Sequence, residues 1–163
     1  MAKKLSRDDP EGIEDGRLAV VPTMLAHWSA LPTKADMPPV CTWPLTTEEG
    51  RAMLHQVIAG QSVVLWDECE REPYTFRVRH LAAHYGEYEP EDRPGELVAG
   101  PILSLIGDGV VYHTSSETCF RSLQQLALLE GAPPWEPMVI LQAQRLPTRN
   151  RRVRLALTYH GRE

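Results

Sequence analysis

The C-terminal segment constrains the fold most, because its pattern is that of a β-hairpin with one apolar and one basic face. Two runs of β-forming residues, 138–146 and 151–159, are joined by a turn signal at Pro147–Asn150. The second run alternates, with Val153, Leu155, Leu157 and Tyr159 on one face and Arg152, Arg154 and Thr158 on the other. Because successive side chains of a strand point to opposite faces, this pattern predicts a half-buried antiparallel hairpin.

Two helices are indicated upstream of this hairpin. The first is expected over residues 46–59: Thr46 and Glu49 have capping-box spacing, and Gly60 follows. Its apolar residues recur at helical spacing and are Met53, Leu54, Val57 and Ile58. The second helix is expected between the capping residues Ser115 and Ser116 and the stop at Gly131. Its expected apolar face is Phe120, Leu123, Leu126, Ala127 and Leu129.

Further strands are expected at 62–67, 74–81, 101–106 and 110–114, with an acidic loop at 86–95 and a turn at Gly107–Gly109. From residue 62 onward this gives the order β-β-β-α-β-β, and it predicts an α+β fold with an antiparallel sheet. A five-stranded OB-like barrel has that order, with the helix at 46–59 as an extra N-terminal helix. An open antiparallel sheet with both helices on one face fits equally well.

The N-terminal third differs from the rest of the chain. Residues 1–17 are charged and poor in large apolar side chains, which predicts a disordered tail. Residues 18–45 form a proline-rich arm, in which the prolines exclude a long regular element. We expect this arm either to pack on the domain or to contact a partner subunit. Residues 46–163 are then expected to form a single α+β domain.

Two features predict where the protein resides. No run approaches the roughly 18 apolar residues of a membrane helix, and no apolar core follows the N-terminal lysines as in a secretory signal. We therefore expect a cytoplasmic protein without membrane contact. The three cysteines, which are Cys41, Cys69 and Cys119, form no C-x-x-C pair, so we expect reduced thiols.

Charge is distributed unevenly along the chain. The formal net charge is -5, yet residues 137–162 hold six arginines and no Asp or Glu. The first 136 residues hold the remaining 11 basic and 21 acidic side chains. A basic segment on an acidic protein points to an anionic partner for that segment.

The basic segment supplies the candidate binding residues. Arg149, Arg151, Arg152 and Arg154 place planar, permanently charged groups at the hairpin turn and on one strand face, where they suit phosphate. Arg77 and Arg79 extend this strip if their strand is a neighbour. The aromatic residues expected to stack on bases are Trp66, Tyr74, Phe76 and Tyr112. The alternative is a solvated or salt-bridged edge, whose arginines also prevent strand-to-strand aggregation.

These residues favour a small accessory protein that binds single-stranded DNA or RNA. The alternative is a protein-interaction or assembly module, including a homo-oligomer, that docks through the proline-rich arm and the acidic loop. We predict no catalytic residue, no metal ligand and no cofactor. His80 and His84 have H-x-x-x-H spacing, but in the predicted strand they would lie about 13 Å apart.

Overall fold

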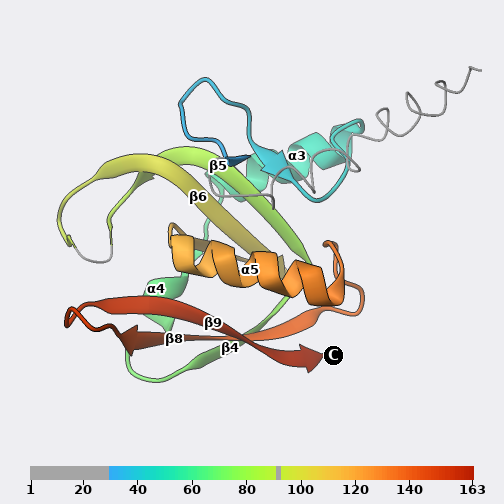
Figure 1. The fold of residues 1–163 in the computed structure, drawn as a ribbon. Helices are drawn as coiled ribbons and strands as arrows, with labels where there is room; N and C mark the ends of the chain where they lie inside the picture. Colours follow the sequence, from blue (N-terminus) through green and yellow to red (C-terminus); the bar gives the residue numbers. More distant parts are fainter. Residues whose placement is uncertain (1–29, 91–92) are drawn as a thin grey trace, which may run out of the picture.

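The computed structural model describes residues 30–90 and 93–163. The predicted tail at 1–17 and the first part of the arm, 18–29, lie outside the described residues. Within them the chain has three helices and two sheets of mainly antiparallel strands (Figure 1). The predicted α+β class is confirmed.

The larger sheet has five strands in the order β2-β5-β6-β7-β3. Their bounds are Val40–Cys41 for β2, Val63–Val64 for β3, His80–Tyr88 for β5, Val98–Gly107 for β6 and Val110–Thr114 for β7. Neighbours pair antiparallel except β3 and β7, which are parallel. Asp108 and Gly109 make the tight β6–β7 turn with φ of 55° and 74°, the left-handed geometry of a two-residue hairpin.

The smaller sheet has three antiparallel strands in the order β4-β8-β9. Its strands are β4 (Tyr74–Val78), β8 (Val139–Pro147) and β9 (Val153–Arg162). The last two pair along nearly their whole length, which confirms the predicted C-terminal hairpin.

The helices are α3 (Glu48–Ala59), α4 (Leu65–Glu68) and α5 (Glu117–Glu130). Side-chain caps begin both long helices: the Thr47 hydroxyl accepts from the Gly50 backbone N–H at 3.0 Å, and the Ser116 hydroxyl from that of Cys119 at 3.2 Å. The first cap is thus Thr47, one residue later than predicted. No helix in the described part of the chain has the length and apolarity to cross a membrane.

The main core lies between the two sheets, where α5 is also packed (Figure 1). It joins side chains of α5, of both sheets and of the connecting segments, among them Phe120, Leu123, Leu105, Leu141 and Trp135. A smaller core covers the other face of the five-stranded sheet, where Leu54 and Val57 of α3 pack near Ala82 and Ile106. The two long helices therefore lie on opposite faces of this sheet, and not on one face as the open-sheet alternative expected.

The described strands form two sheets and no closed barrel, so the OB-like barrel is not confirmed. The reason lies at Arg79, where the predicted strand 74–81 divides between the two sheets. The Arg79 N–H donates to Ile106 O at 2.8 Å, and the Arg79 carbonyl accepts from the Trp135 N–H at 2.9 Å. Arg79 therefore belongs to neither β4, which ends at Val78, nor β5, which begins at His80. The chain crosses from one sheet to the other at this residue.

Two other boundaries and the exposure of three side chains differ from the sequence predictions. The strand expected at 62–67 ends at Val64, after which α4 begins. The strand β5 runs on through Tyr88 into the segment predicted as a loop. On the apolar faces, Leu155 and Leu157 are buried as predicted, but Val153, Tyr159 and Leu129 are 46%, 42% and 82% exposed because they lie beyond the core.

The described part of the proline-rich arm is built into the domain. Leu31 is fully buried in the main core, and Trp43 is buried in the smaller one. The strand β2 pairs with β5, with Cys41 opposite Ala82. Residues 30–45 thus pack on the domain.

Candidate nucleic-acid interface

The tip of the β8–β9 hairpin is a five-residue turn, 148–152, between Pro147 and Val153. Two backbone bonds close it: Thr148 N–H to Arg152 O at 2.7 Å, and Arg151 N–H to Thr148 O at 3.1 Å. Arg151 has a φ of 60°, the left-handed conformation that such a turn needs at one position. These bonds fix the backbone from which the candidate arginines project.

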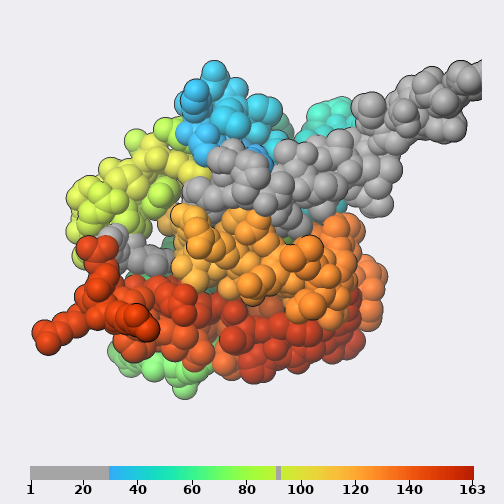
Figure 2. All heavy atoms as spheres, in the orientation of Figure 1, coloured from blue at the N-terminus to red at the C-terminus, as the bar shows by residue number. Residues whose placement is uncertain are grey.

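Four arginines surround this turn, and all four are exposed: Arg149, Arg151, Arg152 and Arg154. Among the described residues, none of them has an ion-pair partner or a side-chain hydrogen bond. The turn projects from the body of the molecule at the left of Figure 2. The structure therefore presents four guanidinium groups to solvent on one short segment, which we call the arginine tip.

The other two arginines of the basic segment are used inside the protein. The Arg145 guanidinium lies 3.9 Å from the centre of the Trp66 ring and donates twice to the Trp66 carbonyl, at 2.6 and 3.1 Å. Arg162 pairs with Glu130 at 2.9 Å and donates to the Pro137 carbonyl at 2.8 Å. Hydrogen bonds from Arg162 and Tyr159 lower the pKa of the Glu130 carboxyl. These two arginines therefore make contacts between segments of the chain that are distant in sequence.

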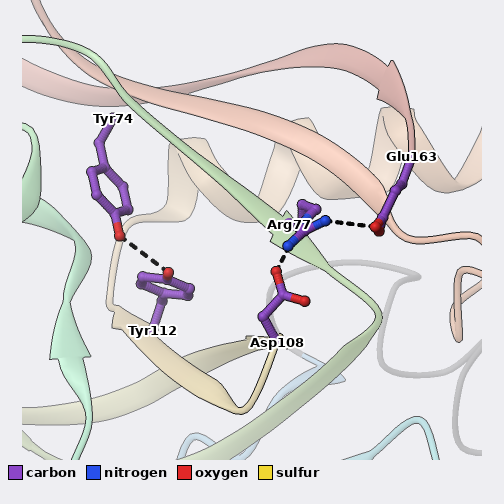
Figure 3. Close-up of polar contacts among 5 residues, drawn as sticks. All are labelled: Tyr74, Arg77, Asp108, Tyr112 and Glu163. Carbon is purple, nitrogen blue, oxygen red and sulfur yellow. Dashed lines mark hydrogen bonds and ion pairs between the residues drawn. The ribbon is translucent and has the colours of Figure 1, made fainter.

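Arg77 does not extend the arginine tip. It lies between Asp108 and Glu163, with its Nε 2.6 Å from the Asp108 carboxylate (Figure 3). Its register partner on β8 is Ile140. That residue is seven positions from Pro147, hence about 23 Å along the strand. Arg77 is therefore both paired with acids and remote from the turn.

Arg79 has an acidic partner as well. Its guanidinium lies 3.1 Å from the Glu136 carboxylate, and its Nε is buried without a hydrogen-bond partner among the described residues. Arg79 sits at the crossing between the two sheets. We therefore assign it to the fold and leave it out of the interface.

The aromatic candidates on strands pack against one another. Phe76 and Tyr112 are 5% and 6% exposed, with ring centres 4.7 Å apart. The hydroxyls of Tyr74 and Tyr112 lie 3.2 Å apart (Figure 3), and burial raises the pKa of Tyr112 well above its ordinary value. Phe76 and Tyr112 are thus buried in this cluster and Tyr74 is half-buried, so we leave these rings out of the interface.

Trp66 lies on α4 and not on a strand. It is half-buried, and the Arg145 guanidinium lies over its ring in a cation–π contact. Sequence reasoning missed this contact, because the two residues are 79 positions apart and nothing in their spacing links them. The interface that remains from the predicted set is the arginine tip.

No known protein family, curated protein or solved structure matches this chain in the comparisons with known proteins. The described residues contain no group of three or more His, Cys, Asp or Glu side chains placed to hold a metal ion.

Proposed function

We propose that this protein binds single-stranded nucleic acid through the arginine tip. The supporting observation is the contrast between two sets of arginines in the described part of the chain. Arg77, Arg79 and Arg162 have acidic partners, whereas the four tip residues have none. Like charges crowded on one turn repel each other, and an anionic partner relieves that repulsion.

Phosphate is the group that this arrangement suits best. A guanidinium makes two parallel hydrogen bonds to phosphate oxygens, and it stays charged at every physiological pH. Contacts of this kind carry no sequence information, so we expect binding that tolerates many sequences. Because the packed aromatic rings are not part of the proposed interface, the affinity for nucleic acid comes from phosphate contacts.

A single strand is favoured over a duplex because the protein has a net charge of -5. A flexible strand can follow one small basic turn, whereas a rigid duplex also brings phosphates near the acidic remainder of the protein. We accordingly propose an accessory role on single-stranded DNA or RNA in the cytoplasm.

The test is fluorescence anisotropy with labelled oligo-dT and oligo-U at low salt. We compare the wild-type protein with the double variant Arg151→Ala/Arg152→Ala. The control is Arg71→Ala/Arg121→Ala, which removes the same charge from exposed positions outside the hairpin. We expect saturable binding that the tip variant weakens and the control leaves nearly unchanged. No binding by the wild-type protein at low salt overturns the proposal, and so does an equal loss in both variants.

A further inference from the structure

A cleft of about 370 Å³ opens between α4, the end of β5 and the end of β7. The side chains that give it chemical character are Trp66, Asp67, Glu87, Tyr88, Glu89 and His113. Its volume is near the lower end of the range for small-molecule pockets, which runs from about 300 to 1,000 Å³. The cleft therefore suits a compact ligand, about the size of a long amino-acid side chain.

The cleft is anionic. Asp67, Glu87 and Glu89 line it, and neither Lys nor Arg is among its lining residues. Within the described residues, Asp67 and Glu87 have no ion-pair partner, and Glu89 accepts a hydrogen bond from the Gly95 N–H at 2.8 Å. Three carboxylates repel a phosphate. The ligand of this cleft therefore differs from that of the arginine tip, and the argument for it does not depend on the proposed function.

Aromatic rings stand beside these carboxylates. Trp66 and Tyr88 both line the cleft and are half-buried. Trp66 already holds one guanidinium, that of Arg145, at 3.9 Å from its ring centre. The faces of Trp and Tyr rings attract cations, most strongly where water is partly excluded. Aromatic rings beside carboxylates form the kind of site that binds organic cations, because both groups attract positive charge.

His113 supplies an independent observation. Its Nδ1 lies 2.8 Å from the Ser62 hydroxyl, and the ring also bonds to the Val57 backbone. Its Nε2 is buried and has no hydrogen-bond partner in the described part of the chain. A hydroxyl can donate or accept, so the Ser62 bond permits the tautomer with Nδ1–H, in which Nε2 is an acceptor. Because buried polar atoms are nearly always paired, this unpaired nitrogen of a cleft-lining residue indicates a missing hydrogen-bonding partner.

We infer that this cleft binds a compact organic cation, a guanidinium or primary ammonium group on a short apolar body. The carboxylates of Asp67 and Glu87 balance its charge, and the rings of Trp66 and Tyr88 contact its body and cationic face. An N–H of the ligand donates to Nε2 of His113. Free small molecules and the basic side chain of a peptide share this chemistry.

The test is calorimetric titration of the full-length protein with butylguanidinium and, as a neutral probe of the same shape, butylurea. We expect saturable binding of butylguanidinium and at least about tenfold weaker binding of butylurea, since only the former carries the charge. Histidine side-chain NMR gives a second readout, in which butylguanidinium shifts the Nε2 resonance of His113. Absence of saturable butylguanidinium binding overturns the inference, and so does equal binding of the two probes.

Substitution localises the effect. Asp67→Asn/Glu87→Gln should weaken butylguanidinium binding about tenfold or more, since it removes two of the three carboxylates. The matched control Asp36→Asn/Glu48→Gln neutralises two exposed carboxylates outside the cleft and should bind as the wild type does. An equal loss in both variants assigns the binding to net charge and refutes the site. Should the cleft variant fail to fold, the comparison of the two probes on the wild type decides.

Discussion

Gly107 is the position where a single added methyl group should test the crossing of the two sheets. It is the last residue of β6, and a Cβ built on it would lie 2.0 Å from the Arg77 carbonyl oxygen and 2.7 Å from its carbon. Both atoms belong to the backbone of β4, so no rotamer change relieves the contact. The two strands must separate by about 1 Å before Cβ and oxygen reach even a tight contact.

The magnitude follows from this geometry. Overpacking of a core costs about 1–3 kcal/mol when side chains can adjust, and a clash with backbone lies at the upper end. We therefore expect Gly107→Ala to lower the free energy of unfolding by about 3 kcal/mol. With a urea m-value of about 2 kcal/mol/M, the unfolding midpoint falls by about 1.5 M.

Gly109→Ala is the matched comparison, two residues further along the chain. Gly109 has a φ of 74°, and a Cβ there meets nothing within 4 Å. Its substitution should cost only the strain of a left-handed alanine, about 1 kcal/mol. Urea unfolding followed by circular dichroism measures both variants. A Gly107→Ala protein that is as stable as Gly109→Ala would refute the close crossing of β4 and β6.

Three further predictions concern the core. Leu123→Ala removes a fully buried side chain of α5 between the sheets and should cost about 2–5 kcal/mol in urea unfolding, while a loss below about 1 kcal/mol would contradict that packing. Burial lowers the pKa of His84 and His113 below 6.5, so these histidines take up protons at a higher pH in the unfolded state than in the folded state. The melting temperature should therefore fall as the pH drops below about 6.5. A melting temperature that does not depend on pH in this range would contradict the burial of the two histidines. All three cysteines are buried and none forms a disulfide within the described residues, and burial raises the pKa of Cys41, so a thiol reagent should label the native protein far more slowly than the unfolded protein.

Local signals made the helices and the C-terminal hairpin predictable from the sequence. A hydroxyl cap, apolar residues at helical spacing and a closing glycine all act within one helix, so their pattern is complete in a short window. The turn 148–152 is similar, because its exposure follows from Pro147 and the polar residues beside it. The position of the four tip arginines at this turn and on one strand face was therefore accessible from the sequence alone.

The division into two sheets was not accessible. Phe76 and Val78 precede Arg79 and Leu81 follows it, and all three are buried in the main core, although one unbroken strand would place Leu81 on the opposite face. Only the bonds of Arg79 to Ile106 and Trp135 reveal the break. Both partners are distant in sequence, and periodicity carries no information about them.

The partners of the candidate site residues were hidden for the same reason. Arg77 pairs with residues 31 and 86 positions away. A strand with two arginines on one face has the same sequence pattern whether they are free or paired. The structure therefore separates the free tip residues from the paired ones, a distinction that composition and alternation do not make.

The salt dependence of oligonucleotide binding tests the central proposal most directly. For single strands, log affinity falls with log salt at a slope of about −0.7 per neutralised phosphate, so four tip arginines give about −2.8. Raising salt from about 50 to about 200 mM should then weaken wild-type binding about 50-fold. Arg151→Ala/Arg152→Ala should halve the slope to about −1.4. A slope that stays the same in this variant, or a wild-type protein that binds no oligonucleotide at about 50 mM salt, would contradict binding through the arginine tip.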